Sequence, residues 1–239
     1  ALTIMNCLET VGGELNAFTN KEDTVYYAAI LKEHFAKAVD LLSDIVFYSL
    51  YPQSEINKEI EVICDEIESY NDSPAELIYD LFENIIFHGH PLGHNILGDA
   101  WQLRTYNSET AKTFTQRFYK PQNAVFFAYG DINFDNLVDL LKKRTKGFGV
   151  QKPIIGDADI VAPLPAYQPT TKCIEKGTHQ THVMIGNRAY SVHDERRIAL
   201  YLLNNIIGGP SMNARLNLSL RERYGLVYTV ESTMVSYSD

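Results

Sequence analysis

A stretch rich in glycine and proline near the middle of the sequence divides the chain into two parts. Residues 147–169 contain three glycines and four prolines and show no helical periodicity, which is typical of a linker. We therefore expect a first domain at residues 1–150, a linker at 151–169 and a second domain from 170 to 239. Each part mixes predicted hairpin strands with predicted helices, so the pattern indicates an α+β fold rather than alternating βαβ units.

The first part of the chain begins with the pattern of a β-hairpin. Two short strands, 14–19 and 24–30, flank a polar turn at 20–23, and the second strand is rich in β-branched and aromatic residues. Apolar residues then recur mostly at helical spacing. The predicted helices are 32–50, 54–70, 75–87, 108–119 and 134–143, and one further strand is predicted at 124–129. Residues 88–98 carry three glycines and a proline and are predicted to form a loop.

The same kind of pattern begins again after the linker. Strands are predicted at 171–175, 182–185 and 227–235, and helices at 194–207 and 212–223. No helix closes the pattern after the last strand. We therefore expect one nearly complete domain followed by part of a second, homologous one, in a chain whose two ends look cut from a longer protein.

The composition argues against several classes of protein. The chain has 239 residues, of which 45% are hydrophobic and 21% charged, as in ordinary globular proteins. Its net charge of −9 argues against a nucleic-acid partner, and no apolar run approaches the roughly 20 residues that span a membrane. Cys7, Cys64 and Cys173 are odd in number and far apart, so we expect three small core residues and no disulfide framework.

The predicted helix at 54–70 carries two carboxylates that are candidates for chemistry. An apolar stripe runs along one side of this helix and consists of Ile56, Ile60, Ile63 and Ile67. Glu59 and Glu66 are about two helical turns apart, so they share one face at the edge of that stripe. Partial desolvation there would suit a metal ligand or an acid with a shifted pKa. The alternative is an ordinary solvated helix face.

Two groups of histidines have spacings that a metal could use, but their surroundings argue against it. His88, His90 and His94 lie in the loop rich in glycine and proline, without a nearby acid cluster. His179 and His182 lie at the start of a predicted strand, where residues three apart point to opposite faces. We therefore expect no metal at either group.

Arg221 and Tyr228 lie on either side of the junction between the last predicted helix and the last predicted strand. Taken alone, they are best interpreted as a surface arginine and a strand tyrosine. The sequence contains no nucleophile elbow, phosphate-binding loop or dinucleotide fingerprint that would assign it to another enzyme class.

Several stretches resemble one family when they are taken together. They are Gly-Gly-Glu-Leu-Asn-Ala-Phe-Thr at 12–19, Glu-Ile-Glu-Val-Ile-Cys-Asp-Glu-Ile at 59–67, His-Pro-Leu-Gly at 90–93, Tyr-Lys-Pro-Gln-Asn at 119–123 and Leu-Arg-Glu-Arg-Tyr-Gly-Leu-Val-Tyr at 220–228. In this order they resemble the pitrilysin-type zinc peptidases, the family of mitochondrial processing peptidase and insulin-degrading enzyme. The resemblance implies the metallohydrolase fold of that family, in which helices pack on sheets rich in antiparallel strands.

The resemblance also implies roles for the two helix carboxylates. It makes Glu66 the carboxylate ligand of a catalytic zinc ion, and it makes Glu59 a supporting acid on the same helix face. The same resemblance places both histidine groups at positions that are not zinc ligands in this family.

Two further sets of residues acquire substrate-binding roles through the resemblance. Asn16, Ala17 and Phe18 become part of an edge strand that pairs with the backbone of a peptide or unfolded polypeptide substrate. Arg221 and Tyr228 become a distal pair that grips the substrate from the second domain.

One part of the family pattern is missing. The His-x-x-Glu-His motif supplies two zinc ligands and the general base in this family, and it occurs nowhere in this sequence. The resemblance implies that the motif lies upstream of Ala1 in a full-length protein. Because a catalytic zinc takes three protein ligands and a water, we expect this chain alone to bind no zinc and to be inactive.

The resemblance leaves two functions open. The first is that the full-length protein is an active zinc metalloendopeptidase; the second is that it is a non-catalytic partner subunit of a processing-peptidase-like complex. The presence of both Glu59 and Glu66 favours the active enzyme. Because Arg221 and Tyr228 occur in the same chain, a homodimer is also suggested, in which each subunit grips the substrate of the other. A purely structural protein of this length is disfavoured by the abrupt ends.

Overall fold

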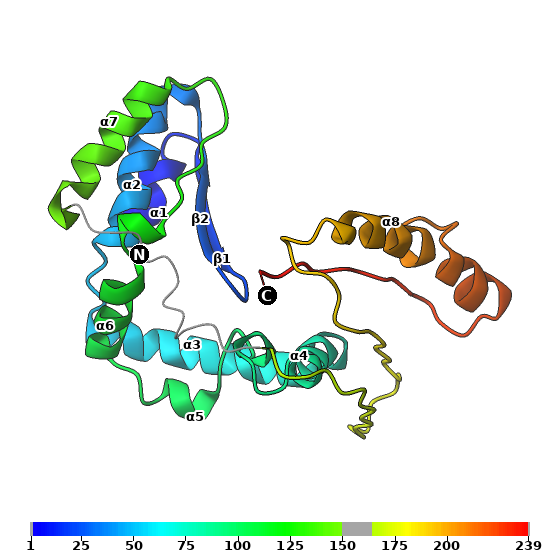
Figure 1. Ribbon diagram of the computed structural model, residues 1–239. Coiled ribbons are helices and arrows are strands. Elements are labelled where there is room, and N and C mark those ends of the chain that lie inside the picture. Colours follow the sequence, from blue (N-terminus) through cyan, green and yellow to red (C-terminus); the bar gives the residue numbers. More distant parts are fainter. Residues whose placement is uncertain (1, 150–163, 239) are drawn as a thin grey trace.

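The computed structural model describes residues 2–149 and 164–238, which form a mainly helical protein with a small antiparallel sheet (Figure 1). Within the described part, the α+β class predicted from the sequence is confirmed. The linker predicted at 151–169 lies largely outside the described residues, so the division of the chain into two domains stays a prediction. No helix in the described part is long and apolar enough to cross a membrane.

The hairpin and three helices form the best-buried part of the molecule. Strand β1 (Glu14–Thr19) pairs with β2 (Thr24–Ala29), α1 (Leu2–Glu9) and α2 (Phe35–Phe47) pack beside them, and α7 (Phe134–Thr145) packs on α2 (Figure 1). Leu8 of α1 is fully buried against Ala38 and Leu41 of α2, and Leu15 and Ala28 of the hairpin pack on the same cluster. The hairpin is therefore fixed on one side by a hydrophobic core.

Two long helices extend away from this core. Helix α3 (Gln53–Asp72) ends at Ser73, because the residue before a proline disfavours helical backbone angles, and Pro74 then begins α4 (Pro74–Ile86). Ile60 of α3 is buried and the other three residues of the predicted apolar stripe are half-buried, which confirms the stripe; Cys64 is buried beside it. Shorter elements complete the first half: η1 (Lys32–His34), η2 (Pro91–Gly93), α5 (Ala100–Leu103), α6 (Ser108–Phe118), η3 (Pro121–Asn123) and η4 (Lys146–Phe148).

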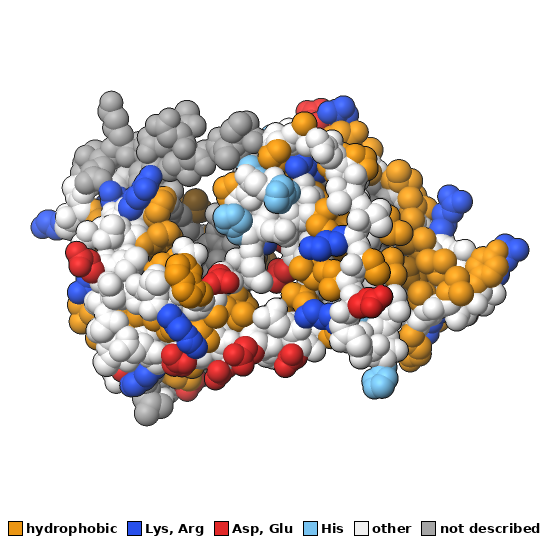
Figure 2. All heavy atoms as spheres, turned by 90° about the horizontal axis from the view of Figure 1, so that it is seen from below, with side chains coloured by type: hydrophobic (Ala, Val, Ile, Leu, Met, Phe, Trp, Pro, Cys, Tyr) orange, Lys and Arg blue, Asp and Glu red, His pale blue; other side chains and the backbone are white. Residues whose placement is uncertain are grey.

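The second half consists of two helices and an extended C-terminal segment, residues 227–238. Helix α8 (Arg196–Gly208) is followed by η5 (Asn217–Arg223), which is a π-helix. The C-terminal segment runs back along α8 and is held by hydrogen bonds from the Ser232 N–H to the Gly208 carbonyl (2.7 Å) and from the Val192 N–H to the Tyr237 carbonyl (2.8 Å). In Figure 2, apolar side chains gather over the side of the molecule where α8 lies, so its apolar face is largely exposed.

Four predicted strands are wrong for the described residues. Segments 124–129, 171–175, 182–185 and 227–235 form no ladder with another strand in the part of the chain that the structure describes. A strand is stabilised by its neighbours, and an alternating apolar sequence alone does not supply them. Val125 and Tyr129 are accordingly 97% and 94% exposed.

The helix predictions agree with the structure better than the strand predictions do. All seven predicted helices are present within a few residues, but α1 and the one-turn α5 were not predicted. The cap of α6 is Asn107, whose side-chain oxygen accepts the Glu109 and Thr110 N–H groups, so the helix begins at Ser108. Of the three cysteines, Cys64 is buried as expected, whereas Cys173 is exposed, so the prediction of three core cysteines is wrong.

Candidate functional site

Strand β1 has one edge that no strand of the described chain covers. Asn20 donates its N–H to the Asp23 carbonyl (2.8 Å) at the turn. The backbone N–H and carbonyl groups of the even-numbered β1 residues therefore point to β2, and those of the odd-numbered residues point away from it. The outward backbone groups are those of Leu15, Ala17 and Thr19. The Ala17 N–H is held by the Asn16 side-chain oxygen at 2.8 Å, which agrees with this assignment.

The residues predicted to bind substrate on this strand are accessible. Asn16, Ala17 and Phe18 are all exposed, and the Phe18 ring contacts Tyr27 of β2 edge to face, with centroids 6.2 Å apart. The predicted hairpin is thus confirmed, and its open edge presents a backbone donor at Ala17. Such an edge can accept a further strand through main-chain hydrogen bonds.

The two helix carboxylates are more exposed than the sequence suggested. Glu59 and Glu66 both lie on α3 and belong to one face, since they are about two turns apart. Both side chains are solvent-exposed, so the expected partial desolvation at the edge of the apolar stripe is wrong. The stripe is narrow because α3 packs mainly on α4 and α5, which leaves Glu59 and Glu66 in solvent. Their assigned roles stay predictions.

Arg221 and Tyr228 are brought together by the turn that follows η5. Gly225 has φ of 58°, a left-handed conformation that suits glycine, and its N–H bonds the Arg221 carbonyl at 3.0 Å. The chain then reverses, and the Arg221 guanidinium lies 5.7 Å from the centroid of the Tyr228 ring. Tyr228 is 89% exposed, so the ring face and the cation form a surface pair rather than a core contact.

The described residues do not form a metal site by themselves. No three His, Cys, Asp or Glu side chains in the described ranges converge in a way that could hold a metal ion. His90, one of the histidines considered above, is buried, and its Nδ1 accepts the Leu92 N–H at 3.3 Å. A zinc ion that used Glu66 would therefore need further ligands from outside this set.

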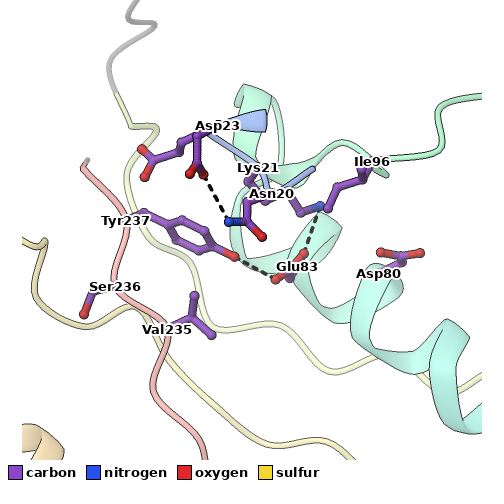
Figure 3. A pocket seen from close by; sticks show the side chains of 10 residues that line it. Asn20, Lys21, Asp23, Asp80, Glu83, Ile96, Val235, Ser236 and Tyr237 are labelled. Atoms are coloured by element: carbon purple, nitrogen blue, oxygen red, sulfur yellow. Dashed lines mark hydrogen bonds and ion pairs between the residues drawn. The ribbon is translucent and has the colours of Figure 1, made fainter. Parts of the chain in front are cut away.

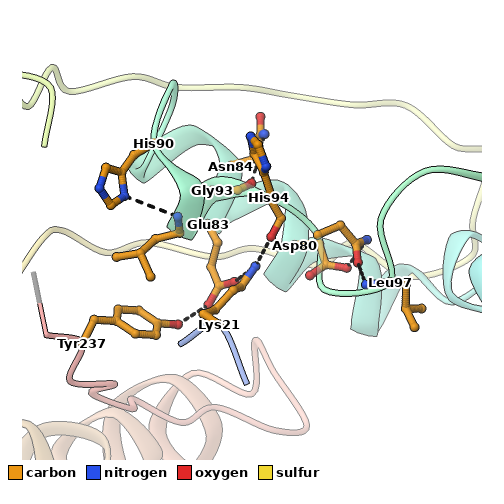
Figure 4. Close-up of polar contacts among 11 residues, drawn as sticks. Lys21, Asp80, Glu83, Asn84, His90, Gly93, His94, Leu97 and Tyr237 are labelled. Carbon is orange, nitrogen blue, oxygen red and sulfur yellow. Dashed lines mark hydrogen bonds and ion pairs between the residues drawn. The ribbon is translucent and has the colours of Figure 1, made fainter. Parts of the chain in front are cut away.

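A buried ionic cluster that the sequence did not indicate lies where the hairpin turn meets α4 and the C-terminal segment (Figures 3 and 4). Lys21 pairs with one oxygen of Glu83 at 2.9 Å, and Tyr237 donates its hydroxyl to the other oxygen at 2.9 Å. Burial and the Glu83 carboxylate raise the pKa of the Tyr237 phenol. Burial also raises the pKa of Asp80, a neighbouring carboxyl in the same cavity of about 290 Å³.

Comparison with known families agrees with the arrangement of these parts. Residues 105–239 match the family described as "Peptidase M16 inactive domain", and residues 1–100 match "Insulinase (Peptidase family M16)". The chain belongs to the M16 family of peptidases, the pitrilysin and insulinase family. The resemblance seen in the sequence is thereby confirmed.

Two curated relatives carry names that describe zinc proteases. The chain is 33% identical over 245 residues to the zinc protease YmxG of Bacillus subtilis, with all of this chain and 57% of that protein aligned. It is 32% identical over 239 residues to a zinc protease of Rickettsia bellii, with 97% of this chain and 55% of the relative aligned. The chain therefore spans a little over half the length of these relatives.

Two solved structures share the fold. A protease of Helicobacter pylori aligns over 99% of this chain and 57% of its own, with a TM-score of 0.79 and 18% identity. A peptidase M16 inactive domain from Pseudomonas fluorescens aligns over 98% of this chain and 56% of its own, with a TM-score of 0.74 and 18% identity. At these identities the likeness establishes the fold alone.

Proposed function

We propose that this chain is part of a zinc metalloendopeptidase that cleaves peptides or unfolded polypeptides. The observation that carries the proposal is the open edge of β1, where the Ala17 backbone faces outward beside the exposed Phe18. Membership of a peptidase family and the names of its relatives support the same function.

The strand edge supplies the first step, which is substrate binding. An extended peptide pairs with the outward backbone groups of β1, and its N–H and carbonyl groups replace water on Leu15, Ala17 and Thr19. The Asn16 side chain already occupies the Ala17 N–H, so it turns aside as the substrate carbonyl takes that donor. Peptides and unfolded chains expose such an extended segment more readily than folded proteins do, which favours them as substrates.

The carboxylates of α3 supply part of the catalytic centre. Glu66 would provide one oxygen ligand, and Glu59, on the same helix face, would act as a supporting acid. When it is held by three protein ligands, zinc lowers the pKa of a bound water to about 7, which gives a nucleophile at neutral pH. The remaining ligands and the general base come from a His-x-x-Glu-His motif elsewhere in the full-length protein.

Arg221 and Tyr228 hold the substrate at a second point. The guanidinium offers several donors to substrate carbonyl groups, and the exposed tyrosine ring keeps it oriented. Both residues lie in the second half of the chain, so the substrate would contact both halves. A homodimer, in which this pair serves the neighbouring subunit, is a further possibility for the full-length protein.

The proposal is tested by cleavage of an unstructured peptide by the full-length protein. We expect hydrolysis that a zinc chelator abolishes and that added zinc restores, together with a His-x-x-Glu-His motif upstream of Ala1. Absence of the motif, or cleavage that persists without metal, would contradict the proposal.

A second candidate is a non-catalytic partner subunit. It is compatible with the match of residues 105–239 to a domain described as inactive, although Glu59 and Glu66 lie in residues 1–100, which match "Insulinase (Peptidase family M16)". Co-purification with a separate subunit that carries the complete motif, and cleavage only by the pair, would support this alternative over an enzyme that acts alone.

A further inference from the structure

The turn of the β1–β2 hairpin contacts the far end of the chain. Lys21 and Glu22 form the tip of the turn, and the C-terminal segment passes beside it, with Tyr237 lying near Lys21 (Figure 3). Ser238 of the same segment bonds Glu22. Helix α4 contributes Glu83 from below. Three parts of the chain that are distant in sequence therefore meet around one cavity.

Glu83 joins the other two parts through its two oxygens. One oxygen forms the ion pair with Lys21 at 2.9 Å, and the other accepts the Tyr237 hydroxyl at 2.9 Å (Figure 4). The Lys21 side chain is only 7% exposed and the Glu83 side chain 27%, so water competes little for either charge. Lys21 also donates to the His94 carbonyl. A buried ammonium group without its carboxylate would be strongly unfavourable, which makes this contact hard to break piecemeal.

Glu22 forms a second connection at the same place. Its carboxylate oxygens accept the Ser238 backbone N–H at 2.9 and 3.0 Å, and one of them also accepts the Ser238 hydroxyl. The hairpin tip is thus connected to the C-terminal segment twice. Lys21 is connected to Tyr237 through Glu83, and Glu22 bonds Ser238 directly.

The C-terminal segment transmits this attachment to the rest of the second half. The Tyr237 carbonyl accepts the Val192 N–H at 2.8 Å just before α8, and Ser232 bonds the end of α8 at Gly208. The same segment contains Tyr228 near its start, just after the turn at Gly225. A series of hydrogen-bonded contacts therefore leads from the strand edge through the hairpin tip to the pair Arg221 and Tyr228.

We propose that Lys21, Glu22, Glu83, Tyr237 and Ser238 form a latch that fixes the spacing between the substrate-binding edge of β1 and the pair Arg221 and Tyr228. The five residues are positioning residues, because none of them is assigned to the substrate or to zinc. This role rests on the proposed function, because the spacing between the two binding points determines which substrates can contact both. Its structural part, the attachment of the two halves, does not depend on catalysis.

The test measures the distance between the two halves in the 239-residue chain. Spin labels are attached at Lys112→Cys on α6 and Ala199→Cys on α8, two exposed positions, in a background with Cys7→Ala and Cys173→Ser. Pulsed electron spin resonance then reports the distribution of label distances. We expect Glu83→Gln and Tyr237→Phe to lengthen and broaden the distribution relative to the unmodified latch.

Matched changes outside the latch serve as controls. Glu55→Gln removes an exposed carboxylate that pairs with Lys58 in the same helix, and Tyr129→Phe removes an exposed hydroxyl. Both should leave the distribution unchanged. Tyr237→Phe deletes one oxygen and keeps the ring contact with Phe87, so it stays folded and decides the question even where Glu83→Gln does not fold.

An unchanged distance distribution in Tyr237→Phe would overturn the latch. In the full-length protein the same variant should raise KM for a long peptide several-fold and change kcat little, because the binding points are displaced and the reacting groups are not. If the distances lengthen but no peptide is cleaved by any form, the latch stands and the proposed function fails.

Discussion

The Arg221 guanidinium lies 5.7 Å from the centroid of the Tyr228 ring, because the chain reverses at Gly225 between the two residues. An exposed tyrosine whose ring faces a cation is oriented without being buried. The pair can therefore contact another molecule at little cost in side-chain entropy, because the arginine is already held in place.

Loss of this pair should weaken substrate use without disturbing the metal. We predict that Arg221→Ala lowers kcat/KM of the full-length protein for an unstructured peptide by about tenfold, since a contact of roughly 1.4 kcal/mol to the bound substrate is removed. Zinc content, measured by mass spectrometry, should be unchanged.

Arg196→Ala is the matched control for that experiment. Arg196 also lies over a tyrosine ring, 4.4 Å from the centroid of Tyr190, and pairs with Asp194 at the start of α8. Because nothing assigns this pair to substrate, kcat/KM should stay the same. Equal losses in the two variants would show that Arg221 acts only through stability.

The close approach of α8 to the C-terminal segment depends on Gly208. A Cβ atom there would lie 2.6 Å from the Ser232 Cβ and 2.9 Å from the Ser232 backbone nitrogen. We predict that Gly208→Ala lowers the free energy of unfolding by about 1–3 kcal/mol, as overpacking does elsewhere. Urea denaturation followed by circular dichroism measures this change.

Gly147→Ala provides the comparison, because a Cβ at Gly147 meets nothing within 4 Å and its backbone is not left-handed. Its free energy of unfolding should change by no more than about 0.5 kcal/mol. A Gly208→Ala variant as stable as Gly147→Ala would show that the C-terminal segment is not packed on α8 as described.

Helical periodicity predicted much of this fold, and its limits are physical. The stripe of α3 was visible in the sequence because four isoleucines recur on one side of a long helix, and Ile60 among them is buried in the structure. The short α1 was not predicted because eight residues give a weak periodic signal, although Leu8 is fully buried. Strand 124–129 was wrongly predicted because pairing depends on residues that the local pattern does not contain.

The candidate site, too, was predicted only in part from the sequence. The spacing of Glu59 and Glu66 correctly placed them on one helix, but their exposure depends on which helices pack beside α3. The contact between Glu83 and Tyr237 joins residues 154 positions apart, so no local pattern could have indicated it. Lys21 was part of a polar turn in the sequence and is a buried charge in the structure.

Asp80 should make stability depend on pH. Burial and the nearby Glu83 raise the pKa of this carboxyl above its ordinary value of 3.8, while Lys21 partly opposes them. The folded state therefore binds more protons than the unfolded state at and just above pH 3.8, so this residue's contribution to stability falls as pH rises through that window. At neutral pH the full penalty is present.

We predict that Asp80→Asn raises the free energy of unfolding at pH 7 by up to about 0.5 kcal/mol, and that the gain disappears below pH 4. The amide keeps an oxygen that can accept the Asn95 side-chain N–H, which Asp80 now accepts at 2.7 Å. Urea unfolding at pH 7 and at pH 3.5 measures both values. Asp139→Asn, an exposed change on α7, should show no such difference, and a variant that is less stable than the original at pH 7 would refute the prediction.

The metal provides the most direct prediction about Glu66. The 239-residue chain should carry well under one zinc per molecule, because one carboxylate does not replace three protein ligands. In the full-length protein, Glu66→Gln should lower zinc affinity at least tenfold, since a neutral amide oxygen is a weaker ligand than a carboxylate, and peptide cleavage should fall with it.

Glu68→Gln changes another exposed glutamate of the same helix and should retain both zinc and activity. Zinc content after dialysis against a graded series of chelator concentrations distinguishes the two variants. Full zinc content and full activity in Glu66→Gln would remove this residue from the metal site, and one zinc per 239-residue chain bound through His88, His90 and His94 would mean that the histidine loop was wrongly excluded.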